Sequence, residues 1–193
     1  MAIQINGNGT ITGISAGGLP AGTVTSATLA SGVGGKVLQV VQAFKNDTES
    51  LTNTETITDI NGLSVTITPA SSSSKFLITG RVSISWVQYQ NHNIFINVNG
   101  SVVGSGAASG NRSTAHGGIG YTNTDNTYAQ IQVPIEYLVN ASNANAHTIK
   151  LQWQAPDITG NRTIYLNRNN SDPNHDDSGN RYTSSLTVME IAA

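Results

Sequence analysis

Cysteine is absent from the 193-residue chain. This absence excludes disulfide bonds, thiol catalysis and zinc sites built from thiolates. Charge is scarce as well: charged residues make up 10% of the chain, against about 25% in an average soluble protein. Asn, Ser, Thr, Gln and Gly take their place, and such a surface repels neighbouring molecules only weakly. The composition therefore favours a protein that works inside an assembly or that binds neutral sugars.

Basic residues are few, with nine Lys and Arg in total and a formal net charge of −2. Nucleic-acid binding requires clustered Lys and Arg that neutralise phosphates, so neither DNA nor RNA is an expected partner. Long apolar runs are also lacking, because no window approaches the roughly 18 apolar residues of a membrane span. The first residues lack the basic start and apolar core of a signal peptide, so we expect a chain that is made in the cytoplasm without an export signal.

From Lys36 onward, apolar and polar residues alternate with a period of two, as expected for half-buried antiparallel strands. The clearest case is KFLITGRVSISW, residues 75–86. One face of this strand is predicted to be buried: Phe76, Ile78, Val82, Ile84 and Trp86. The other face is predicted to meet solvent: Lys75, Thr79, Arg81, Ser83 and Ser85.

The same alternation predicts further strands at residues 36–44, 62–69, 93–103, 129–137, 147–154 and 182–191. Pro134 cannot donate to a strand ladder, so its strand is expected at a sheet edge or at a bulge. Asn99 and Gly100 predict a tight hairpin, because both tolerate left-handed torsions. We count about eight to ten strands and one short helical candidate, residues 25–32. This pattern predicts an all-β fold, an antiparallel sandwich or jelly roll.

The chain divides into two parts of different composition. Residues 1–35 contain no Asp, Glu, Lys or Arg and hold nine of the twenty glycines, so backbone entropy disfavours their independent folding. We predict an extended N-terminal anchor arm over residues 1–35 and a β-domain over residues 36–193. Two long polar stretches of the β-domain, residues 104–127 and 155–181, are expected to be loops that carry a binding surface.

Two motifs have more than one interpretation. GISAG, residues 13–17, matches the nucleophile elbow of α/β-hydrolases, but that elbow needs a strand before the serine and a long helix after it. Because Pro20 and several glycines follow, we interpret the motif as a turn. SDPNHDDSGN, residues 171–180, gathers Asp172, His175, Asp176 and Asp177. A solvated loop is favoured there, with a structural divalent ion as the alternative. We predict no catalytic residue, no metal and no cofactor.

Five tyrosines lie in or beside the polar stretches, together with three arginines and many asparagines. An aromatic ring can stack on a sugar while amide and guanidinium groups bind its hydroxyls. The alternative is that some of these tyrosines cap the sheet edges or pack between subunits. The residues predicted to contact a ligand are Tyr89, Arg112, His116, Tyr165 and Arg168.

The stretch NGNGTITGISAGGLPAGTVTSATLASGVGGKVLQVVQ, residues 6–42, resembles the N-terminal segment of short fibre and decoration proteins in the virions of tailed bacteriophages. GLSVTITPASSSSKFLITGRVSIS and SSLTVMEI are similar to the β-domains that follow in such proteins. Those domains are trimeric jelly rolls that look like the tumour necrosis factor and complement globular-head superfamily. The resemblance implies a homotrimer in the virion, with no membrane insertion. The residues expected to dock the arm are Ile3, Ile5, Ile11, Ile14 and Leu19.

We therefore expect a non-enzymatic virion protein: a short trimeric tail fibre whose arm joins the tail and whose β-domain meets a glycan of the host surface. The alternative is a trimeric capsid decoration protein, in which the arm binds the major capsid protein. A remote alternative is a glycan-degrading enzyme, which requires a close pair of carboxylates. Glu136 and Glu190 are the only glutamates that we expect on strands.

Overall fold

The computed structural model describes residues 4–5, 11–12, 36–52, 54–86, 91–120, 127–156 and 163–193. Its internal contacts divide the chain into two units, Met1–Lys36 and Val37–Ala193. In the first unit, β1 (Gln4–Ile5) pairs antiparallel with β2 (Ile11–Thr12). The helical candidate at residues 25–32 lies outside the described residues.

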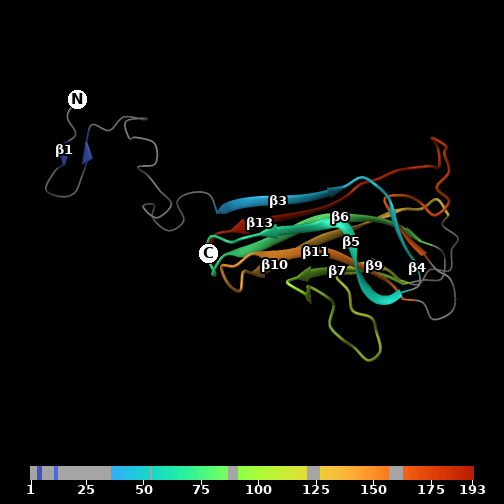
Figure 1. Ribbon diagram of the computed structural model, residues 1–193, viewed down its shortest axis with the longest axis horizontal. Helices are drawn as coiled ribbons and strands as arrows, with labels where there is room; N and C mark the ends of the chain where they lie inside the picture. The colour runs from blue at the N-terminus through green and yellow to red at the C-terminus, as the bar shows by residue number, and fades with distance from the viewer. Residues whose placement is uncertain are drawn as a thin grey trace. The chain divides into compact units, whose positions relative to one another are not determined.

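The second unit is built from two antiparallel sheets, and all the regular structure described in it is strand (Figure 1). Its strands are β3 (Val37–Lys45), β4 (Glu49–Thr52), β5 (Thr54–Ile67), β6 (Lys75–Trp86), β7 (His92–Val98), β8 (Ser101–Val103), β9 (Gly117–Ile119), β10 (Ile131–Asn140), β11 (His147–Ala155), β12 (Thr163–Leu166) and β13 (Ser184–Ile191). The predicted all-β antiparallel sandwich is confirmed.

The first sheet is organised around the long strand β6. One edge of β6 pairs first with β13 and then with β12, and these two strands pair with β3 and β4. The other edge of β6 pairs with β10. Within the described residues β10 has no second partner, so Pro134 lies on an edge strand, as predicted.

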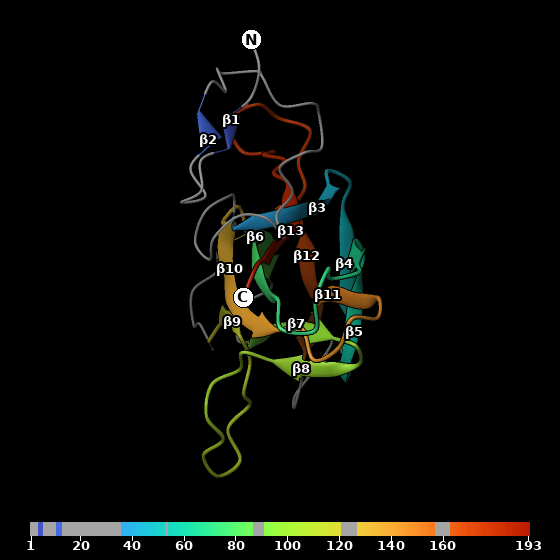
Figure 2. The same ribbon diagram turned by 90° about the vertical axis from the view of Figure 1, so that its left-hand side faces the viewer.

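The second sheet has the order β5, β11, β7, with β8 and β9 both on the free edge of β7. In Figure 2 the hairpin of β7 and β8 lies on the side of the sandwich away from β3. The turn of this hairpin is Asn99–Gly100, with φ of 52° and 88°. The Gly100 amide also donates to Oδ1 of Asn97 at 2.9 Å. The hairpin predicted from the Asn-Gly pair is confirmed.

The core lies between the inner faces of the two sheets. The alternating residues predicted to face inward on β5, β6 and β11 are buried, and Trp153 is the largest fully buried side chain among them. Burying a large apolar side chain stabilises the fold by about 1.5–3 kcal/mol relative to exposure. The period-two pattern of the sequence therefore indicates correctly where most of this core is made.

Two features of this unit differ from the sequence-based expectation. Ser83 and Ser85 were expected to face solvent but are fully buried, because the chain after β12 covers the outer face of β6 there. The Ser85 hydroxyl donates to the carbonyl of Arg168 at 2.8 Å. The stretches 104–127 and 155–181 are not loops throughout, because β9 lies in the first and β12 in the second. Tyr165 is therefore a strand residue.

Candidate functional site

The outer face of the first sheet carries a row of apolar side chains across four strands. Val40 of β3 is the register partner of Met189 in β13, Met189 is the partner of Leu77 in β6, and Leu77 is the partner of Leu138 in β10. Directly paired residues project to the same side of a sheet. Val40 is 55% exposed and Leu138 is 51% exposed. We call these four residues the apolar row.

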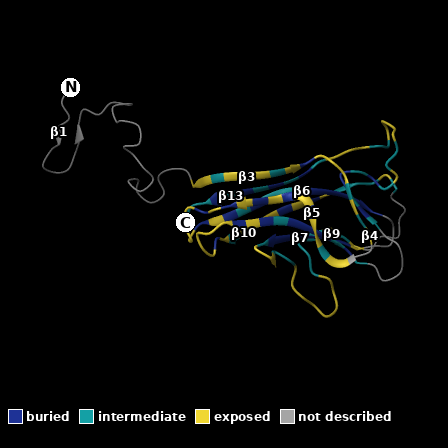
Figure 3. Cartoon of the chain, in the orientation of Figure 1, coloured by how far each residue is buried: buried dark blue, intermediate teal, exposed yellow. Residues whose placement is uncertain are grey.

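The apolar row is part of a larger face that also carries Lys75, Arg81 and Glu136. Leu38 and Phe44 extend it along β3 and are also exposed, and Figure 3 shows exposed residues along the length of this strand. Thr187 and Thr79 are register partners on the same face. We call the apolar row together with Leu38 and Phe44 the assembly face.

Sequence reasoning placed a strand at the assembly face but did not predict that its outer side is apolar. The available signal was the segment VLQVVQAF of β3, which is apolar on both sides of the strand. Strands that read this way are usually buried on both faces. Within the described part of the second unit, the inner side of β3 is the covered one, since Val41 and Ala43 pack against the core.

Tyr165 and Arg168, two predicted contact residues, are brought together. The Arg168 guanidinium carbon lies 4.0 Å from the centre of the Tyr165 ring. Arg168 Nη1 also lies 3.8 Å from Asp172, whose other carboxylate oxygen is 2.6 Å from Arg181 Nη2. One face of the Tyr165 ring is therefore covered by a guanidinium. A ligand contact at either residue stays a prediction.

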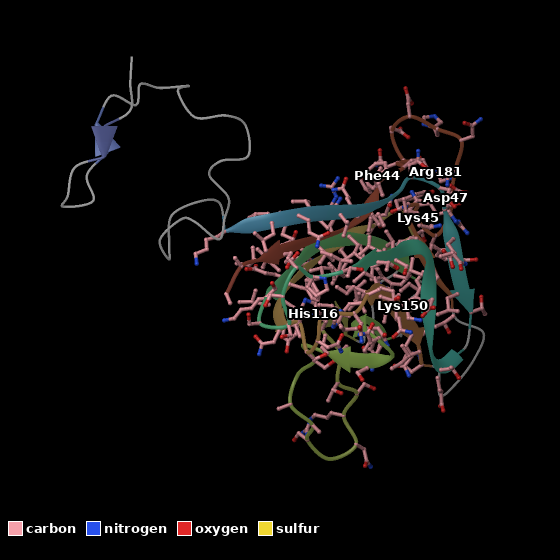
Figure 4. The ribbon with its side chains drawn as sticks, turned by 60° about the vertical axis from the view of Figure 1, so that its left-hand side comes forward. Phe44, Lys45, Asp47, His116, Lys150 and Arg181 are labelled. Atoms are coloured by element: carbon pink, nitrogen blue, oxygen red, sulfur yellow. The ribbon has the colours of Figure 1, made fainter. Side chains whose placement is uncertain are left out.

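Arg112 and His116 lie on a different part of the surface, in the loop between β8 and β9. Figure 4 shows His116 on the other side of the sandwich from Phe44 and Arg181. The His116 Nδ1 atom is 3.1 Å from the carbonyl of Gly104, and the Glu136 amide donates to Nε2 at 3.4 Å. Both ring nitrogens are thus used to hold the loop against β10. This network assigns the proton to Nδ1.

The structure leaves several predicted residues untested. The side chains of Ile5 and Ile11 are not described, although their backbones are register partners between β1 and β2. The remaining predicted residues lie outside the described residues: Ile3, Ile14, Leu19 and Tyr89. Docking by the arm therefore stays a prediction.

The acidic stretch after β12 separates into two groups. Asp172 pairs with Arg181, whereas His175, Asp176 and Asp177 are exposed and place one ligand atom each within 4.8 Å of one another. Exposed acidic groups gather in this way with or without an ion, so the solvated loop and the structural ion both stay predictions.

The strand glutamates do not form a pair of catalytic type. Glu136 is exposed on the outer face of β10, whereas Glu190 is fully buried on the inner face of β13. The expectation that they are the only glutamates on strands was wrong, because β4 begins at Glu49 and β5 contains Glu55. β4 and the first half of β5 lie in a polar region where no clear alternation predicted a strand.

The buried carboxylate of Glu190 is held by hydrogen bonds within the fold. Its carboxylate accepts hydrogen bonds from the Gln39 side chain at 2.6 Å and from the Ala70 amide at 2.7 Å. Burial by itself would raise the pKa of Glu190, but these hydrogen bonds outweigh it and hold the pKa below its ordinary value. Glu190 thereby fixes the connection between β5 and β6 against the start of β3.

Comparison with known proteins finds similar solved structures, but no protein-family model and no curated protein matches the chain. Among solved structures, it is similar to infectious bursal disease virus of the Gx strain (15% identity, TM-score 0.41) and of the Gt strain (13%, 0.40), and to the VP2 subviral particle of the same virus (15%, 0.39). Each match covers 80% of this chain and 37% or 38% of the other. At these values the likeness carries no conclusion about function.

Proposed function

We propose that this chain is a structural protein of a tailed-bacteriophage virion, a short trimeric tail fibre. The arm, residues 1–35, attaches it to the tail. The loops of the β-domain meet a glycan of the host surface. The protein acts by assembly and binding and not by catalysis.

The observation that carries this proposal is the assembly face. Its four strands, at about 4.8 Å spacing and about 3.3 Å per residue, and the 8 residues of β13 give the whole outer face, with its polar and charged positions, an area of roughly 500 Å². Each partner in a specific interface contributes about 800 Å², so this face can form the central part of an interface. The exposed side chains of Val40, Leu138 and Phe44 favour burial against another protein surface.

Further copies of the same chain are the partner that the charges favour. Arg81 and Lys75 of β6 and Glu136 of β10 project to the same side as the apolar row, near its borders. Copies that pack around a symmetry axis can bring such opposite charges together while burying their apolar rows. The resemblance of residues 6–42 to fibre and decoration proteins favours three copies.

The composition and chain path support a division of labour. The arm has no charged residue, so it can lie against a partner without burying an unpaired ion. The second unit begins with β3 beside the end of β13, where Val37 pairs with Ile191. Contacts between loops lie at the opposite end of these strands, where the Ser171 amide donates to the carbonyl of Thr127. The sandwich thus offers one end for attachment and another for contact with the host.

Deletion of residues 1–35 tests this division. The expected result is a truncated protein that remains trimeric but is absent from assembled particles. Light scattering measures the first property, and immunoblotting of purified particles measures the second. A truncated protein that falls apart into single chains would show that the arm is an oligomerisation element instead.

The position on the particle is tested by imaging virions whose copies carry a label at the C-terminus. A tail fibre predicts a few labelled copies on the tail, whereas capsid decoration predicts many copies distributed over the head. An enzymatic role has its own readout, since purified protein would then release glycan fragments and lose this activity when the acids of residues 172–177 are replaced.

A further inference from the structure

A pocket of about 440 Å³ lies beside β9, between the loop 104–116 and the start of β7. Its side-chain lining includes Asn91, Asn93, Asn111, Arg112 and Ser113. The backbone of residues 117–120, three of which are glycines, lines the rest. This volume is within the range of small-molecule sites, about 300–1,000 Å³.

The polar groups of the lining are available for a ligand. Arg112 donates to the carbonyl and hydroxyl oxygens of Ser109 through Nη1 alone, at 3.1 and 3.0 Å. Its Nε and Nη2 groups have no hydrogen-bond partner among the described residues, and neither do the side-chain amides of Asn91 and Asn111. Asn93 donates to Gln154 at 3.0 Å, which leaves its own carbonyl oxygen available. Donors and acceptors thus occur together on one concave surface.

The described residues of the lining carry positive charge alone. Among the described residues that line the pocket, Arg112 is the one charged residue and none is a carboxylate. A guanidinium matches a carboxylate through two parallel hydrogen bonds, while asparagine amides offer both donors and acceptors to hydroxyl groups. Ala115 and Ile119 add apolar side chains to the described lining, and such surface can pack against the CH groups of a sugar ring.

The glycines that line the pocket are present for different structural reasons. A side chain at Gly118 would collide with the carbonyl of His92, and one at Gly117 would come within 2.8 Å of Val133. These two positions need glycine so that β9 can pack. At Gly120, in contrast, a Cβ atom would meet nothing within 4 Å, and φ there is not positive. Gly120 therefore keeps space open in the pocket without being required by the fold.

We propose that this pocket binds a saccharide unit that bears a carboxylate, with Arg112 holding the carboxylate and the asparagines holding ring hydroxyls. The inference rests on the proposed function, because it names the class of host glycan that the β-domain contacts. It also identifies a role for Arg112 that His116, held by Gly104 and Glu136, does not share.

Titration of the ¹⁵N-labelled full-length protein with saccharides tests the pocket. The probes are a disaccharide containing glucuronic acid, its neutral glucose counterpart and its sulfated counterpart. We expect the uronic acid to shift the amide resonances of residues 117–120 and to bind about tenfold more tightly than the neutral sugar, a difference of about 1.4 kcal/mol, since hydrogen bonds to a charged group are stronger than those to a neutral one. Equal binding of the neutral sugar, tighter binding of the sulfated sugar, or no shift with any probe at about 10 mM would overturn the proposal.

Two pocket variants and one control sharpen the test. Gly120→Leu fills the open space and is expected to abolish the shifts, and Arg112→Lys is expected to weaken binding about tenfold because the forked contact is lost. Gly106→Leu is the matched control: it adds the same side chain to the loop between β8 and β9, outside the pocket lining, where a Cβ atom lies 4.0 Å from the nearest atom. Unchanged binding by Gly120→Leu, or equal losses in Gly106→Leu, would contradict the proposal.

Measuring whether the protein is incorporated into particles distinguishes a failure of this inference from a failure of the proposed function. A wild-type protein that joins the tail normally but binds none of the three saccharides overturns the pocket alone. A wild-type protein that is absent from purified particles overturns the proposed function, whatever the saccharide result.

Discussion

The Ser184 hydroxyl donates to the side-chain carbonyl of Asn167 over 2.7 Å inside the β-domain. The Asn167 amide nitrogen donates in turn to the carbonyls of Lys45 and Asp47, at 3.1 and 2.9 Å. Ser184 also accepts the Ser83 amide at 3.0 Å. One buried asparagine therefore joins the end of β12 to the starts of β13 and β4 and to the end of β3.

Replacement of Asn167 by alanine is expected to lower the free energy of unfolding by about 2–4 kcal/mol. The variant leaves buried carbonyls without donors, and it places alanine at a φ of 58°, which asparagine tolerates better. Urea denaturation measures the change. Asn174→Ala is the matched control, because Asn174 is exposed and should cost less than about 0.5 kcal/mol. Equal effects of the two replacements would show that the Asn167 network is unimportant.

Gly80→Ala is expected to destabilise the contact between β6 and β13. A Cβ atom at Gly80 would collide with the backbone carbonyl of Ser185 and lie 3.2 Å from Cα of Leu186, so the two strands must separate. Overpacking of this kind costs about 1–3 kcal/mol, which corresponds to a fall in Tm of roughly 3–10 °C for a domain of this size. Calorimetry checks the value, with Gly120→Ala as a control at an open site. A Tm within roughly 1 °C of the wild type would contradict the close approach.

His92 is expected to make stability depend on pH. The ring is fully buried, neither nitrogen has a hydrogen-bond partner among the described residues, and burial lowers the pKa of His92 to about 4. The unfolded chain takes up this proton near pH 6.5. The neutral His92 ring therefore makes its full contribution to the free energy of unfolding above about pH 6.5. As the pH falls from 6.5 towards 4, this free energy decreases by about 3 kcal/mol in total.

The His92 prediction is tested by measuring the free energy of unfolding of the wild type and of His92→Leu at several pH values and taking the difference. That difference should change between pH 6.5 and 4 and stay constant above pH 7. A wild-type and a His92→Leu curve that remain parallel over this range would show that the His92 ring is charged in the folded protein.

Local sequence pattern was sufficient for much of the fold. The inward positions of β11, the edge position of Pro134 and the Asn99–Gly100 turn each depend on a residue and its near neighbours. β12 was missed because four strand residues are embedded in a polar stretch, although Ile164 and Leu166 alternate with Thr163 and Tyr165. Short strands of this kind are stabilised by their partners more than by their own sequence.

The candidate sites could not be predicted without the register between paired strands, which the sequence does not reveal. The apolar row joins Val40, Leu77, Leu138 and Met189, which lie on four strands far apart in the chain. The pocket likewise brings Asn91 to Arg112 and Gly120 through the pairing of β7 with β9. Sequence patterns indicated Arg112 as a contact residue, but they could not show that the guanidinium opens onto a cavity.

Sedimentation equilibrium of the full-length protein, wild type beside a Val40→Lys and Leu138→Lys double variant, tests assembly through the apolar row most directly. The account predicts that the wild type has three times the mass of the 20.1 kDa chain, whereas the double variant has the mass of one chain and keeps the wild-type circular dichroism. Thr66→Lys, on the second sheet, should remain trimeric. A wild type that sediments as a single chain at micromolar concentration, or a double variant that remains trimeric, would contradict the account.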